Sequence, residues 1–312
     1  MSLTVALVLL AVALTSGWTI DRALRRAQWV EAAPGRALAV WHLAAVSMGG
    51  SVVAVGALLT HDALEHVMFR ATGVSEDQLH QVYAGGIELS ALWNATAVIV
   101  LAGLAALVFH AAATTRATHH SRRRLHDVLD RREVTTLDGF DVVPGDRPFA
   151  YCIPAGARRR SRVVVSSTAR QLLSADELAA VVAHERSHLS RRHHRAVFLA
   201  EVFTRTARPL RILPSYAEEV RRLVELQADD DASLRTGRVP LARALVTMAS
   251  PVGPSGTLAM AGSAVGERVG RMLRRPRHDR RLTSSLLAVA ALAALAPPAT
   301  IGLPALYLAL GA

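Results

Sequence analysis

The sequence predicts an α-helical membrane protein with four spans and, between the third and fourth spans, an α+β domain that is mostly helical with a small β-hairpin or sheet. Apolar residues make up 51% of the chain and aromatic residues only 4%, so the apolar character comes from Ala, Leu and Val. Five of the 36 basic residues, all of them arginine, precede residue 71, and the other 31 lie between Arg116 and Arg281. The apolar stretches predict the spans, and the arginine-rich part predicts the domain.

Each predicted span is an apolar stretch close to or above the roughly 20 residues that an α-helix needs to cross a bilayer. The four stretches are Leu3–Ile20, Ala37–Thr60, Leu89–Ala113 and Ser285–Leu310. Three prolines, at positions 297, 298 and 304, interrupt the last stretch. We expect a kinked helix there, with a re-entrant hairpin as the alternative.

The arginine distribution predicts the orientation, because loops rich in Arg stay in the cytoplasm. The loop after the first span and the segment 114–283 are then cytosolic, both termini are outside, and the protein is a multi-pass protein of the cell membrane in contact with the lipid bilayer. The expected organisation is a three-span region 1–113, a cytosolic domain 114–283 and a fourth span 284–312. This distribution explains the formal net charge of +11 without direct nucleic-acid binding.

Two strand-like runs, Phe149–Ile153 and Arg162–Ser166, open the central part of the cytosolic domain. Pro154 and Gly156 between them are turn residues, so the pattern predicts a β-hairpin. The single cysteine, Cys152, excludes an intrachain disulfide.

Capping signals predict two helices after the hairpin. Ser174 with Glu177 three residues later forms a capping box, and so does Ser215 with Glu218. Gly237 is a stop signal for the second helix.

The first of these helices carries the motif His184-Glu185-Arg186-Ser187-His188. Residues four apart lie on one face of a helix, so both imidazoles can bind one metal ion. Glu185 is then placed to act as the general base on a metal-bound water. The motif therefore predicts a catalytic zinc site, with one Zn²⁺ per chain.

A catalytic zinc ion needs a third protein ligand and an open position. The second helix offers Glu225 as the ligand, and Asp229 one turn later can accept a hydrogen bond from a ligand histidine. Asp230 and Asp231 are rivals in the same acidic run. His193 and His194 are expected to continue the first helix and to point away from the metal, where they either support the ligands from behind or lie at the surface.

These roles predict peptide-bond hydrolysis. Glu185 takes a proton from the attacking water and returns it to the leaving amine. The strand Arg162–Ser166 is expected to be an edge strand along which the substrate backbone lies.

The cytosolic part resembles the BlaR/MecR-type membrane zinc metallopeptidases, in particular their short actinobacterial members. The likeness is carried by Phe149-Ala-Tyr-Cys-Ile-Pro, Val163-Val-Val-Ser-Ser, the helix from Ala175 to His188, and Val224-Glu-Leu-Gln-Ala-Asp-Asp. It implies a gluzincin fold with His184, His188 and Glu225 on zinc and Glu185 as catalyst. The chain ends directly after the expected fourth span, so the C-terminal sensor domain of the best-known members is not expected.

The resemblance implies regulatory proteolysis of a cytosolic partner such as a winged-helix transcriptional repressor. A quality-control protease like the HtpX-type enzymes, which share the HExxH and ExxxD motifs, is the first alternative. A catalytically silent receptor is the second, but it has no chemical need for Glu185. The sequence does not predict the oligomeric state.

Overall fold

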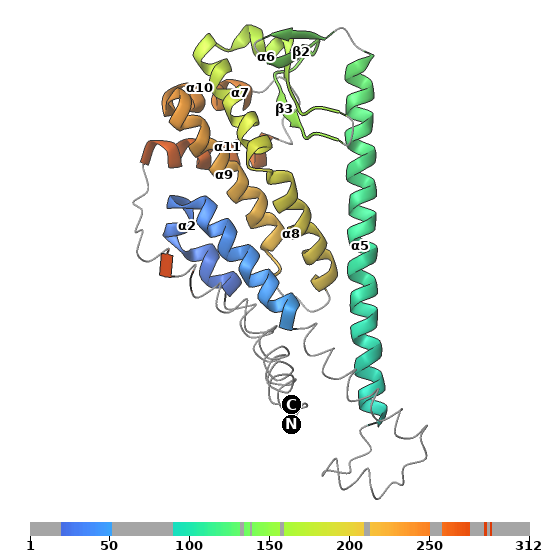
Figure 1. Ribbon diagram of the computed structural model, residues 1–312. Coiled ribbons are helices and arrows are strands. Elements are labelled where there is room, and N and C mark those ends of the chain that lie inside the picture. The colour runs from blue at the N-terminus through green and yellow to red at the C-terminus, as the bar shows by residue number, and fades with distance from the viewer. Residues whose placement is uncertain are drawn as a thin grey trace, which may run out of the picture.

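The computed structural model describes residues 20–51, 90–131, 134–137, 139–156, 159–208, 213–249 and 258–274, together with residues 284, 285 and 288. This part of the chain is mostly helical and contains a small sheet, which lies at one end of the helices (Figure 1). The helices are α2 (Gln28–Ala32), α5 (Ser90–Asp130), α6 (Ser167–Leu172), α7 (Ala175–Ser190), α8 (His193–Ala207), α9 (Tyr216–Thr236), α10 (Arg238–Ala249) and α11 (Leu258–Arg274). The strands are β1 (Thr135–Leu137), β2 (Phe140–Val143), β3 (Ala150–Ile153) and β4 (Arg162–Ser166), and residues 20–26 and 34–51 are also helical.

The sheet has the strand order β1-β2-β4-β3. Strands β3 and β4 form the predicted antiparallel pair, with Ala150 opposite Val165 and Ile153 opposite Arg162. The prediction that Arg162–Ser166 is the edge strand is wrong, because β2 pairs in parallel with the other side of β4. The central place of β4 agrees with its valine run, which is buried on both faces. The edge strand next to β4 is therefore β3.

The start of α7 confirms the first predicted capping box. The Ser174 side chain accepts a hydrogen bond from the Glu177 backbone N–H, and the Glu177 carboxylate accepts one from the Ser174 backbone N–H. The second predicted box is wrong, since Ser215 makes no side-chain cap at the start of α9. Instead, the carboxylate of Asp21 accepts hydrogen bonds from the backbone N–H and the hydroxyl of Ser215, at 3.0 and 3.4 Å.

The N-terminal helices pack against α8 and α9 rather than forming a separate body. Trp41 and Tyr216 are both fully buried, and their rings stack with centroids 6.0 Å apart. Ala37, Ala44 and further residues of 34–51 belong to the same core cluster as the apolar face of α9. In Figure 1 these helices, drawn in blue, lie beside α9, while α5 lies along α8 on the other side.

The predicted four-span membrane fold is contradicted. Within the residues described here, none of the helices combines the length and the apolar character that crossing a membrane requires. The described part of the second predicted span, 37–51, places most of its apolar side chains in the protein core around Trp41, although Val46 is exposed. Apolar length alone does not distinguish a span from a buried core helix, which is why the prediction failed there.

The other predicted spans fall in different parts of the chain. The third predicted span, Leu89–Ala113, falls from residue 90 onward in α5, a helix of 41 residues. The first and fourth, Leu3–Ile20 and Ser285–Leu310, lie almost entirely outside the described residues.

Candidate metal centre

Helix α7 lies between the sheet and α9, and this position brings its motif into contact with both. Val181 and Val182 pack into the cluster that contains the sheet. Ala180 and Ala183 pack in another cluster with Ala232 of α9. Because these alanines are small, α7 and α9 can approach closely, and polar side chains one or two turns further along can meet between the helices.

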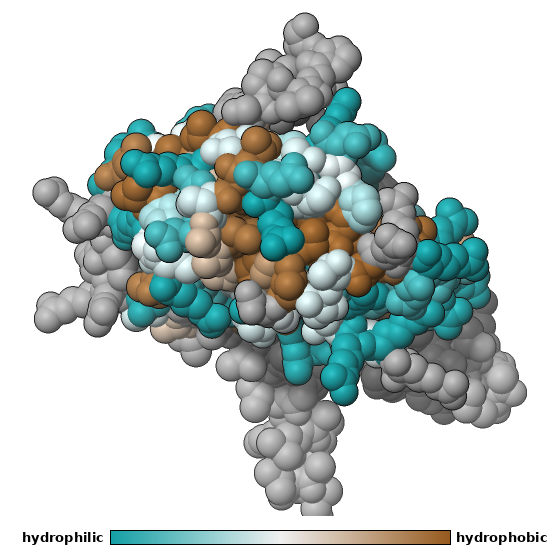
Figure 2. Space-filling model, turned by 90° about the horizontal axis from the view of Figure 1, so that it is seen from above, coloured by the Kyte–Doolittle hydropathy of each residue, from teal (hydrophilic) through white to brown (hydrophobic). Residues whose placement is uncertain are grey.

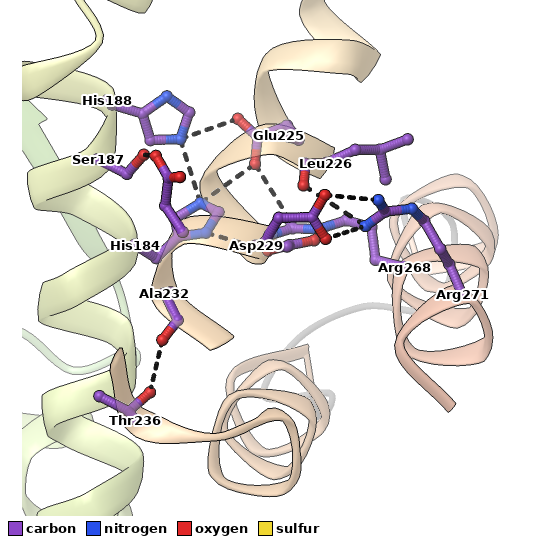
Figure 3. A network of polar contacts seen from close by, with 12 residues as sticks. His184, Ser187, His188, Glu225, Leu226, Asp229, Ala232, Thr236, Arg268 and Arg271 are labelled. Carbon is purple, nitrogen blue, oxygen red and sulfur yellow. Dashed lines mark hydrogen bonds and ion pairs between the residues drawn. The ribbon is translucent and has the colours of Figure 1, made fainter. Parts of the chain in front are cut away.

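The three predicted zinc ligands converge on one point (Figure 3). The Nε2 atoms of His184 and His188 lie 3.1 Å apart. Glu225 on α9 places Oε2 3.4 Å from Nε2 of His184 and Oε1 3.4 Å from Nε2 of His188. His184 is buried, whereas His188 and Glu225 are partly exposed, so one side of the cluster is open.

This spacing fits a tetrahedral zinc ion. Bonds of about 2.0–2.2 Å to four tetrahedral ligands place the ligand atoms roughly 3.3–3.6 Å from one another. The two Nε2 atoms are 3.1 Å apart, and each lies 3.4 Å from a different oxygen of Glu225, so the separations are close to that requirement. Two imidazoles and one carboxylate are the donor set of a catalytic zinc site with one position left for water.

Asp229 lies behind His184 and is held by an arginine of α11. The Asp229 carboxylate, fully buried, is 3.0 Å from Nδ1 of His184, although without ideal hydrogen-bond geometry. Arg268 donates two hydrogen bonds to it, from Nε at 2.7 Å and from Nη2 at 2.6 Å. The same guanidinium lies 3.2 Å from Oε2 of Glu225, so Arg268 connects two of the acidic side chains at the centre.

The other two acidic residues of the run face away from the ligands. Asp230 accepts two hydrogen bonds from Arg271, at 2.8 and 2.7 Å. Asp231 accepts one from the Ser187 hydroxyl at 2.7 Å and two from Arg191, which ties α9 to the end of α7. Neither rival is among the converging ligand atoms, whereas Glu225 is.

The acidic neighbours of His184 favour its protonated form at the point where a metal ion would bind. Burial acts to lower the pKa of His184, but interactions with Asp229 and Glu225 outweigh it and raise the pKa to about 9. For His188, burial and then the nearby charge of His184 lower the pKa to about 4. Burial would raise the pKa of Glu225, but His184 lowers it to about 2. A metal ion would displace the proton on His184, because ligand imidazoles must be neutral.

Glu185 lies on the sheet side of the cluster, next to the edge strand. Burial raises the pKa of its carboxyl group, while the charge of His184 acts in the opposite direction. The Cys152 thiol of β3 lies near this carboxyl group, and burial, followed by the charge of Glu185, raises the pKa of the thiol to about 12. The structure thus places the predicted base directly beside β3.

The prediction that His193 continues the first helix is wrong. Arg192 adopts a left-handed backbone conformation with φ of 55°, which ends α7 and lets α8 begin at His193 in a new direction. His193 is buried, and its Nδ1 lies 2.9 Å from Nδ1 of His188. Its Nε2 lies 3.1 Å from Oε1 of Gln227.

Sequence reasoning missed two residues around the ligands, Arg268 and Gln227, and it placed His193 near the ligands but on the wrong helix. Arg268 is on α11, 39 positions from Asp229, and no local pattern connects the two. The turn before His193 was hidden because it occurs at an arginine rather than at a glycine or proline. The acidic charges of Glu225 and Asp229 were the available signal, since buried carboxylates require a cationic partner.

Comparison with known proteins adds a family match. The model of Peptidase family M48 matches residues 115–217, about a third of the chain. The matched segment contains all of α7 and ends before Glu225. No curated protein and no solved structure matches the chain. The resemblance to BlaR/MecR-type enzymes is not confirmed by this match. Together with the converging His-His-Glu group, this match supports a metallopeptidase.

Proposed function

We propose that the protein is a zinc metalloendopeptidase with one Zn²⁺ per chain, which cleaves a protein substrate bound along the edge of β3. The observation that supports this most directly is the spacing of three ligand atoms from His184, His188 and Glu225, all within 4.8 Å of one another. A structural zinc site would have four protein ligands. Among the described residues, this group has three ligands, and one side of it is exposed.

The chemistry divides between the metal and the residues of α7. A zinc ion held by these ligands would lower the pKa of a water molecule and polarise the carbonyl of the substrate. Glu185 accepts the proton of the attacking water and donates it to the leaving amine, and the raised pKa of its carboxyl group suits both transfers. Asp229 holds His184 from behind, so that Nε2 of His184 faces the ligand cluster.

The edge strand supplies a binding site for the substrate backbone. Within the described sheet, β3 pairs only with β4, so backbone groups along its other side are available for an added strand. The Cys152 side chain lies near Glu185, and α7 packs against β3, so the strand passes close to the general base. A peptide paired with β3 would therefore present its carbonyl groups to Glu185 and to the open side of the ligand cluster.

The nature of the protein substrate rests on sequence alone. Three points stay predictions. They are the winged-helix repressor that the resemblance implies, the cytosolic position of the active site, and the location at the cell membrane. Figure 2, which views the sheet end of the molecule from above, shows apolar and polar side chains mixed over this face. That mixture is compatible with an extended peptide as the ligand.

The proposal is tested by comparing wild type with Glu185→Gln and His188→Ala for zinc content and for cleavage of an unfolded protein substrate. We expect Glu185→Gln to keep about one zinc ion per chain and to lose activity roughly 10²- to 10⁴-fold, because the amide cannot act as a base. His188→Ala should lose the zinc. Glu218→Gln, at an exposed position of α9, is the matched control and should behave as wild type. Near-normal turnover of zinc-loaded Glu185→Gln would refute the mechanism.

A further inference from the structure

We infer that His193 and Gln227 form a positioning chain for the second zinc ligand, and that Gly35 of the N-terminal region holds this chain in place. The inference rests on the proposed zinc site, because it concerns how His188 is oriented toward the metal. No described residue with a charge reaches the far nitrogen of His188 in the way that Asp229 reaches His184. The two histidines would thus be supported in different ways, one by a carboxylate and the other by a neutral chain.

The two ring nitrogens of His188 face different partners. Its Nε2 faces Glu225 and His184, at 3.4 and 3.1 Å, and is therefore the atom available to the metal. Its Nδ1 lies 2.9 Å from Nδ1 of His193, and the two rings meet edge to face with centroids 4.8 Å apart. A hydrogen bond between two Nδ1 atoms needs a proton on one of them only.

These contacts define the tautomers of His188 and His193. The metal-binding Nε2 of His188 must carry no proton, so the neutral ring has its proton on Nδ1 and donates it to Nδ1 of His193. His193 then has its own proton on Nε2, which it donates to Oε1 of Gln227 at 3.1 Å. This arrangement satisfies every nitrogen of both rings. The reverse tautomer of His193 would place two N–H groups against each other.

The side-chain amide of Gln227 contacts Gly35. A Cβ atom built on Gly35 would lie 2.5 Å from Nε2 and 3.3 Å from Cδ of Gln227. The backbone at Gly35 therefore lies against the side-chain amide of Gln227, and a Cβ atom at this position would require that amide to shift. Because the contact is with the end of a flexible side chain, a larger residue would displace the Gln227 amide rather than prevent folding.

The consequence is that His193 and Gln227 pre-orient His188 and raise its affinity for zinc. Removing such partners of a metal-ligating histidine typically weakens metal binding about 10- to 100-fold. His193 is a positioning residue here, because it touches a ligand and neither the metal nor the substrate. The contact with Gly35 makes the zinc site sensitive to how the N-terminal helices pack.

The test measures zinc affinity by chelator competition, and the absorption spectrum of the Co²⁺-substituted full-length protein, in a set of variants. We expect His193→Phe to bind zinc about 10- to 100-fold more weakly and to change the Co²⁺ spectrum. His193→Asn should restore much of the affinity, because its Oδ1 can accept from His188 where Nδ1 did. His194→Phe is the matched control at the neighbouring position and should leave zinc affinity unchanged.

A second part of the experiment uses Gly35→Ala, a substitution outside the metal centre that leaves every residue of the centre unchanged. We expect it to weaken zinc binding by displacing Gln227, and to have no further effect in a Gln227→Ala background. Wild-type affinity and an unchanged Co²⁺ spectrum in His193→Phe would overturn the inference while leaving the proposed function intact. Equal losses in His193→Phe and His193→Asn would also overturn it. Failure of the wild type to bind zinc would instead refute the proposed function itself.

Discussion

At the level of single residues, the ligand cluster depends on a cation that is not part of any motif. Asp229 is completely buried, and Arg268, whose side chain is 16% exposed, makes two short hydrogen bonds to it. A buried carboxylate without a partner is strongly unfavourable. Arg268 thus allows Asp229 to stay ionised behind His184, and it also lies beside Glu225.

Arg268→Met is expected to lower the free energy of unfolding by about 3–5 kcal/mol, because it leaves the Asp229 charge buried with only His184 as a partner. Urea unfolding measures the change. The double variant Arg268→Met with Asp229→Asn should be more stable than the sum of the single effects, since it removes both charges. Arg243→Met, on the exposed side of α10, is the control and should change stability by less than about 0.5 kcal/mol. Additive effects of the two substitutions would contradict the coupling.

At the level of secondary-structure elements, α9 is held at its start by a residue far away in sequence. The Asp21 carboxylate, 2% exposed, accepts the backbone N–H of Ser215, the residue before the helix. It also forms an ion pair with Arg25 at 3.1 Å. Because α9 carries Glu225 and Asp229, the capping contact couples the N-terminal helices to the element that supplies the third ligand.

Asp21→Ala should cost about 0.5–2 kcal/mol of stability, the usual effect of losing a helix N-cap. Faster amide hydrogen exchange in the first turn of α9 is the specific readout. Arg25→Ala serves as control, because it removes only the half-exposed ion pair, worth at most about 1 kcal/mol, and leaves the cap in place. Exchange in α9 that is equally fast in both variants would show that the ion pair, and not the cap, holds the helix.

Local patterns predicted those elements whose signals lie within a few residues. The capping box at Ser174, the pairing of β3 with β4 and the end of α9 at Gly237 all belong to this group. The convergence of His184 with His188 follows from their spacing of four in one helix. The order of strands, the cap from Asp21 and the place of His193 depend on contacts between distant segments, and no local pattern contains them.

At the level of the whole molecule, the N-terminal helices of residues 20–51 and the helices of the arginine-rich segment 114–283 share one core. The cluster that includes Val40, Trp41 and Met48 also includes Val220 and Leu223 of α9. Glu31 accepts a hydrogen bond from Arg222 at 2.8 Å, and its backbone carbonyl accepts one from Arg271. Apolar composition predicted that residues 37–51 would be removed from water but not what would cover them, because a protein core and a lipid phase select the same side chains.

Trp41→Ala tests this shared core directly. Trp41 is fully buried against Tyr216, so truncation to Ala is expected to cost about 3–5 kcal/mol, from lost burial and the cavity left behind. Because the indole lies between the N-terminal helices and α9, the lower stability should also appear in probes located in α7 and α9. Urea unfolding followed both by circular dichroism and by zinc release measures the two. Val46→Ala, on the same helix but 53% exposed, should shift neither transition by more than about 0.5 kcal/mol. Zinc release at the wild-type urea concentration in Trp41→Ala would mean that the N-terminal helices do not stabilise the metal centre.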